Sequence, residues 1–159
     1  MNKWGIERRS IGDAIYYKHN PNGDPFKLKT PETPEEHELY GLGIGLYWGE
    51  GNKANKHSVR LGNTDPELMK VFIRFLIELC GVALKDLRFG LQIFSDTDEQ
   101  AVLDYWTNRL GVKASQFYKI TVTISGSLGT YRRKSQYGVL TVYYHNKKLR
   151  DKLVGILPR

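Results

Sequence analysis

One segment constrains the fold of this chain more than any other, because it is strongly apolar and yet carries a regular series of glycines. Residues 38–50 predict a helix in which Gly41, Gly45 and Gly49 recur at every fourth position and therefore share one face. Each glycine in a helix interior costs about 1 kcal/mol, so such a stripe indicates close approach of a second helix. That helix comes either from this chain or from a second copy of it. The apolar residues point in nearly every direction, which favours burial on all sides: Leu39, Tyr40, Leu42, Ile44, Leu46, Tyr47 and Trp48.

The remaining pattern predicts a single α+β domain with no internal repeat. Asp65 and Pro66 suit the start of a helix that reaches about Cys80 and ends at Gly81. The other predicted elements are strands at 58–64, 87–95, 117–125 and 137–145 and helices at 98–110 and 147–157, with the last two strands forming a hairpin.

Residues 1–35 are predicted to form an N-terminal extension, and residues 36–159 the main domain. Within the extension, 14–19 could form a strand, 20–25 a turn and 26–29 a strand that pairs back. Residues 30–36 are rich in proline and acid and are typical of a linker that leads into a helix.

Composition excludes several classes of protein. No apolar run reaches the length of a membrane span, and the N-terminus has no signal-peptide pattern, so no membrane partner is expected. The single cysteine, Cys80, cannot form an internal disulfide, which favours the cytoplasm. The sequence shows neither a Cys/His cluster for zinc nor a glycine loop that would hold phosphate between a strand and a helix.

The positive charge is concentrated at the C-terminal end of the chain. The net charge is +7, yet residues 105–159 alone hold 11 basic side chains against one acid, Asp151. Such a concentration attracts a polyanion. Arg132, Arg133 and Lys134 lie in a glycine-containing loop and could contact phosphates; the alternative is a charged loop that only meets solvent.

Residues 117–125 alternate strictly, so one side of the strand would be polar and the other apolar. Lys119, Thr121 and Thr123 belong to the polar side, and Tyr118, Ile120, Val122 and Ile124 to the other. A polar strand face can read base edges in a nucleic-acid groove, although it can equally be an ordinary solvated face. The further candidates for nucleic-acid contact are Lys53, Lys56, Arg60, Arg88, Gln92, Thr141 and Tyr143.

The stretch 43–51, with the sequence GIGLYWGEG, resembles the motif of the LAGLIDADG homing endonucleases in a variant whose last acid is glutamate. The resemblance covers roughly residues 38–157. It implies an α+β fold with a curved antiparallel sheet that sits in the major groove of double-stranded DNA. It also implies two motif helices packed across a twofold axis, with a divalent metal ion such as Mg²⁺ at the terminal acids. Trp48 stands where the motif has its first acid, the first strand after the motif is weak, and the strand and helix at 87–110 look inserted.

The resemblance assigns roles by position. Glu50 and Gly49 would hold the metal, and Glu50, Asp65 and Lys147 would be catalytic. Because the chain has one motif, cutting both strands implies a homodimer. Its interface would include Gly41, Leu42, Gly45, Trp48 and Gly49. The alternatives are a helix cap for Asp65, a solvated helix-start lysine for Lys147 and a solvated carboxylate for Glu50.

The sequence therefore predicts a site-specific DNA endonuclease, associated with the nucleoid when bound. A regulator that binds DNA without cutting it, or an RNA maturase on the same fold, is the first rival. A scaffold domain that uses the glycine helix only to dimerise is the second.

Overall fold

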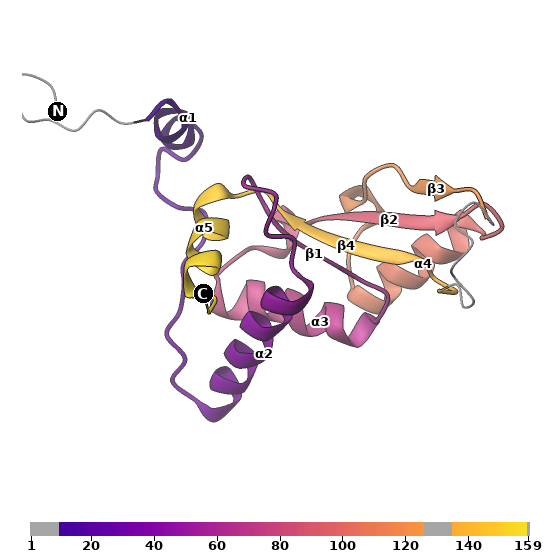
Figure 1. Cartoon of the computed structure of the whole chain (residues 1–159), viewed down its shortest axis with the longest axis horizontal. Coiled ribbons are helices and arrows are strands. Elements are labelled where there is room, and N and C mark those ends of the chain that lie inside the picture. Colours follow the sequence, from indigo (N-terminus) through magenta and orange to yellow (C-terminus); the bar gives the residue numbers. More distant parts are fainter. Residues whose placement is uncertain (1–9, 126–134, 159) are drawn as a thin grey trace, which may run out of the picture.

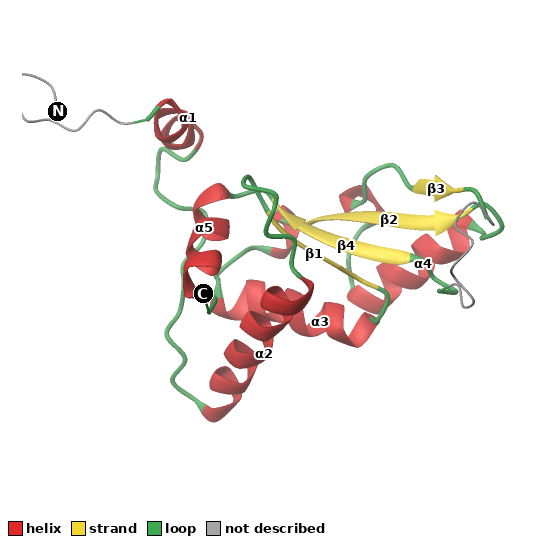
Figure 2. Cartoon of the chain, viewed as in Figure 1, coloured by secondary structure: helices red, strands yellow, loops and turns green. Residues whose placement is uncertain are grey.

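The computed structural model describes residues 10–125 and 135–158, which form an α+β fold of one sheet and five α-helices (Figures 1 and 2). The helices are α1 (Ile11–His19), α2 (Pro34–Glu50), α3 (Pro66–Arg74), α4 (Glu99–Leu110) and α5 (Lys147–Ile156). The strands are β1 (Val59–Asn63), β2 (Arg88–Phe94), β3 (Thr121–Thr123) and β4 (Val139–Tyr144). The α+β class predicted from the sequence is confirmed.

The sheet is mixed, with the strand order β1-β4-β2-β3. Strand β4 runs antiparallel to both β1 and β2, whereas β3 runs parallel to β2. The predicted antiparallel pairing holds for β1, β4 and β2 but not for β3. The predicted hairpin is wrong, because β2 lies between β3 and β4. The strand expected to be an insertion occupies an interior position of the sheet.

One face of the sheet forms the core. Alternate residues of the three long strands are buried there, among them Leu61, Phe89 and Val142, which lie side by side across β1, β2 and β4. Helices α2, α3 and α4 lie on this side (Figure 2), and α3 contacts both its neighbouring helices and β1. No helix of the described residues covers the opposite face, which we call the open face.

Helix α2 is confirmed, but a single chain buries only one side of it. The Thr33 side chain caps its start by accepting from the Glu36 N–H. Its buried residues, at every fourth position, are Leu39, Gly43 and Tyr47. The expectation that all sides are buried fails within one chain, because Leu42 and Trp48 are 47% and 55% exposed.

The helix boundaries predicted from the sequence are largely confirmed. Asp65 and Asp98 cap α3 and α4 through their carboxylates. A π-helical turn, Phe75–Leu79, extends α3 to Cys80, and Gly81 follows with a φ of +66°. Left-handed backbone of this kind favours glycine, which is why the chain turns at this position.

The N-terminal region differs from its prediction. Residues 11–19 form helix α1 and not a strand, because Ser10 accepts from the Asp13 N–H and so caps a helix. The segment after the turn pairs with another part of the chain: the Lys27 N–H donates to the Cys80 carbonyl at 2.9 Å. Phe26, beside it, is buried in the core.

Candidate nucleic-acid interface

The end of α2 is held against the edge of the sheet. Gly51 forms a β-bridge with Leu61, and the Asn52 N–H donates to the Arg60 carbonyl at 2.9 Å. These contacts place Glu50 beside the middle of β1. Its carboxylate is exposed and forms no hydrogen bond or ion pair with the residues described here.

The loop that follows α2 is pinned by α5 and is therefore not free to reach outward. Arg150 donates to the carbonyls of Lys53 and Asn55, the latter at 3.1 Å. Lys53 donates from Nζ to the Trp48 carbonyl at 2.5 Å, where a cation suits the negative end of the helix. Lys53 therefore caps α2, whereas Lys56 on the same loop is exposed.

Two residues assigned to catalysis by position are engaged elsewhere. One Asp65 carboxylate oxygen accepts from the N–H groups of Glu67 and Leu68 at 2.8 and 3.4 Å, so Asp65 is a helix cap. The Lys147 Nζ lies 2.6 Å from the Asp151 carboxylate. The structure shows no contact of either side chain with Glu50. Burial would raise the pKa of Asp151, but hydrogen bonds from Lys147 and Arg150 outweigh it and lower that pKa.

Most of the polar strand residues predicted to contact nucleic acid share the open face. Pairing aligns Arg60, Tyr143 and Arg88 in one row across three strands. Thr141 lies in the next row between two glycines, and Gln92 in the row after it. On the edge strand, Thr121 pairs with Gln92, whose side chain donates to the Thr123 hydroxyl at 3.2 Å.

The two arginines of this face are held in position by the chain itself. Arg60 donates from Nε to the Ser58 hydroxyl at 2.7 Å, and its guanidinium carbon lies 5.2 Å from the centre of the Tyr143 ring. Arg88 donates from Nη1 to the carbonyls of Lys85 and Leu87. Preformed cations of this kind favour an anionic partner, because little side-chain entropy remains to be lost on binding.

Sequence reasoning missed two members of the open face. The Tyr118 hydroxyl lies 2.6 Å from Nε2 of His145, and the Tyr118 ring packs edge-on against Tyr143 at 5.6 Å. Tyr118 therefore lies on the same face as Thr123, which contradicts its predicted place on the opposite side. The alternation fails because residues 118–120 are not in a strand. The spacing of His145, two residues after Tyr143, was the signal that could have placed it here.

The outer edge of the sheet is less regular than predicted. Strand β3 has three residues, and Lys119 precedes it as an exposed residue outside any strand. Val122 and Ile124, predicted to share the apolar side of this strand, are 44% and 73% exposed. The loop cations Arg132, Arg133 and Lys134 lie outside the described residues.

The described residues offer neither a preformed metal-ligand cluster nor a membrane-spanning helix. Residues 10–125 and 135–158 contain no cluster of three or more His, Cys, Asp or Glu side chains that could hold a metal ion. No helix among them has the length and apolar character needed to cross a bilayer.

Comparison with known proteins finds no matching family model, no matching curated protein and no matching solved structure.

Proposed function

We propose that the protein is a homodimeric, divalent-metal-dependent endonuclease that cuts double-stranded DNA at specific sites, in the manner of the LAGLIDADG enzymes. The observation that carries this proposal is one juxtaposition. The exposed glycine stripe of α2 leads directly to the unengaged carboxylate of Glu50, which lies beside β1 at the margin of an open, arginine-bearing sheet face.

The dimer would form through α2. A Cβ built at Gly41, Gly45 or Gly49 would meet no atom within 4 Å apart from its chain neighbours and the nearby backbone of its own helix, so no other part of the described chain fills the space that these glycines leave. Exposed Leu42 and Trp48 flank the stripe. A second copy of α2 would cover these apolar side chains and bring the two helix ends together, because a twofold interface uses the same patch on both copies.

The donor set of one chain fits a metal ion only in part. Glu50 offers carboxylate oxygens, the ligands that Mg²⁺ prefers, and the exposed Gly49 beside it offers a backbone carbonyl. A second carboxylate would come from Glu50 of the partner copy. A bound divalent ion supplies charge stabilisation at the attacking and leaving oxygens of a phosphodiester.

The open face would hold the duplex. Arg60 and Arg88 supply positive charge, and Gln92 and Thr141 offer donors and acceptors to base edges in the major groove. We assign catalysis to Glu50 alone, since Asp65 and Lys147 are engaged as a helix cap and in an ion pair.

A DNA-binding regulator or RNA maturase that does not cut is the second candidate. The observation in its favour is the same engagement of Asp65 and Lys147, which leaves the open face intact but places no second catalytic group beside Glu50.

A plasmid library with randomised inserts, incubated with the protein and Mg²⁺, distinguishes these functions. We expect linear products with the wild type and with Glu38→Gln, a matched change at an exposed glutamate of the same helix, but none with Glu50→Gln. If all three proteins bind the plasmids without cutting them, the result supports the second candidate, the regulator or maturase that does not cut. If the protein neither binds nor cuts the plasmids, both functions are contradicted and the scaffold hypothesis remains.

A further inference from the structure

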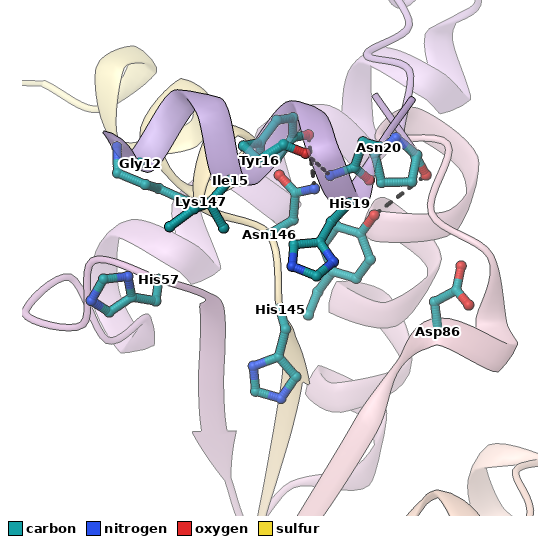
Figure 3. Close-up of a pocket in the computed structure, with 12 residues that line it drawn as sticks. Gly12, Ile15, Tyr16, His19, Asn20, His57, Asp86, His145, Asn146 and Lys147 are labelled. Carbon is teal, nitrogen blue, oxygen red and sulfur yellow. Dashed lines mark hydrogen bonds between the residues drawn. The ribbon is translucent and has the colours of Figure 1, made fainter. Parts of the chain in front are cut away.

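A cleft of about 740 Å³ lies between α1 and the end of the sheet (Figure 3). Three imidazoles line it and come from three separate parts of the chain: His19 from the end of α1, His57 from the loop before β1, and His145 from just after β4. The volume lies in the range of small-ligand sites, which is about 300–1,000 Å³.

The roof of the cleft is held in place by a group of polar contacts. The Tyr16 hydroxyl donates to Asp24 at 2.9 Å and accepts from the Asn146 amide at 3.1 Å. Lys148 lies 4.4 Å from the centre of the Tyr16 ring and 3.2 Å from the Asp24 carboxylate. Because these contacts join α1 to the start of α5, the cleft exists before any ligand arrives.

The walls suit a flat heteroaromatic ligand. Rings make up much of the lining, with Tyr144 beside the imidazoles, and few other polar groups are present, among them the Asn20 amide and the Asp86 carboxylate. A few polar groups on aromatic walls are what a nucleobase needs for stacking and for recognition of its edge. A bare phosphate fits less well, because Asp86 would repel it and the Lys147 ammonium is paired with Asp151.

The cleft adjoins the open face through one residue. His145 lines the cleft and also stacks on Tyr143 of the open face, with the ring centres 6.0 Å apart and the planes 17° from parallel. Tyr143 in turn carries the Arg60 guanidinium above its ring. If a nucleic-acid strand on the open face ended beside Tyr143, its unpaired terminal base would therefore lie near the mouth of the cleft.

We propose that this cleft takes up an unpaired nucleobase, supplied by the end of a strand that lies on the open face. The proposal rests on nucleic-acid binding by that face. The base would stack on Tyr144 among the imidazoles of His19, His57 and His145, with its edge toward Asn20 and Asp86. The cleft would thereby favour frayed or single-stranded ends over a fully paired duplex.

Fluorescence anisotropy tests the proposal with two DNA ligands: a blunt duplex, and the same duplex with three unpaired adenosines at one 3′ end. We expect the wild type to bind the second about tenfold more tightly, in keeping with the stacking of one base. His19→Ala and His57→Ala, changes in two different elements, should abolish this preference while leaving blunt-duplex affinity unchanged. Lys18→Ala, on the same helix but outside the cleft, should keep the preference.

Adenosine 5′-monophosphate serves as a third ligand that distinguishes the source of the base. A second outcome is that the overhang gives no advantage, while the monophosphate binds saturably to the wild type and fails to bind either histidine variant. In that case the cleft takes a free nucleotide, and the proposal that a strand end supplies the base is wrong. If neither ligand shows a dependence on the histidines, or if both variants weaken the two duplexes equally, the base site is contradicted. If the blunt duplex fails to bind while the monophosphate does, the nuclease proposal fails and the cleft stands.

Discussion

Gly43 of α2 packs directly against the ring of Phe75, so closely that a Cβ at position 43 would lie 2.1 Å from the Phe75 Cγ. At Gly45, two residues further along, an added Cβ would lie more than 4 Å from every atom apart from its chain neighbours and the nearby backbone of α2. The glycines of one helix therefore lie in two different environments: Gly43 meets the core of its own chain, and Gly45 faces open space.

This difference predicts opposite effects for two substitutions in the same helix. Gly43→Ala should lower the free energy of unfolding by roughly 1–3 kcal/mol, because the added methyl overpacks the Phe75 contact. Gly45→Leu should keep the melting temperature of the single chain but convert the proposed dimer to a monomer in light scattering. An unchanged mass for Gly45→Leu would contradict helix pairing, and an unchanged stability for Gly43→Ala would contradict the packing within the chain.

Two buried tyrosines should respond differently to loss of the hydroxyl. Among the described residues, the Tyr47 hydroxyl is buried without a hydrogen-bond partner, while the Tyr144 hydroxyl donates to the Pro25 carbonyl at 3.3 Å. Tyr47→Phe should therefore keep or raise the free energy of unfolding, whereas Tyr144→Phe should lower it by about 1 kcal/mol. Urea denaturation measures both, and a larger loss for Tyr47→Phe would contradict the assignment.

The loop cations should contribute to DNA affinity through phosphates alone. Replacing Arg132, Arg133 and Lys134 with glutamine should reduce the slope of log affinity against log salt by up to about 2.7, because each phosphate contact contributes about 0.9. The control removes Lys70 and Arg74, two cations of α3 in the helical layer, and should leave the slope unchanged. An unaltered slope after the triple change would show that this loop does not contact the duplex.

Stability should depend on pH through His145. Partial desolvation of its imidazole, which stays partly exposed to solvent, and the charges of Arg60 and Arg88 lower its pKa below the ordinary value. The unfolded chain therefore takes up this proton at a higher pH than the folded chain, so stability is full above about pH 7 and falls as the pH drops through about 6.5. Tyr118 and Tyr143 also face the ring.

Comparison with His145→Gln isolates this effect from other groups. The variant should lose less stability than the wild type between roughly pH 7 and pH 5, as measured by thermal melting across that range. The lowered pKa values of carboxylates such as Asp24 and Asp151 act at lower pH, so they leave the difference between the two proteins unaffected. Identical slopes for the two proteins would contradict the lowered pKa of His145.

Local signals in the sequence predicted the helices well where each signal acts over a few residues. The Asp65 cap and the bounds of the helix predicted at 98–110 each depend on contacts within one turn of helix, and both are confirmed. The strand predicted at 14–19 is wrong because Ser10 caps a helix that runs through these residues.

The sheet could not be read in the same way, because strand order depends on contacts far apart in the chain. Nothing local shows that β2 separates β3 from β4 or that β3 pairs in parallel. The same limit applies to the candidate site. Alternation placed Arg60 and Tyr143 on one face, but the irregular segment before β3 brought Tyr118 to that face as well.

Disulfide capture between two copies of Gly45→Cys, in a background that carries Cys80→Ala, tests the central claim most directly. A disulfide forms readily only when two Cα atoms approach within about 7 Å, as paired α2 helices would require. We expect rapid oxidation to a product of twice the 18.3 kDa chain mass. No such product should form from Glu78→Cys, an exposed position in the π-helical turn after α3. A Gly45→Cys protein that stays monomeric, or that couples no faster than Glu78→Cys, would contradict the dimer and with it the proposed nuclease.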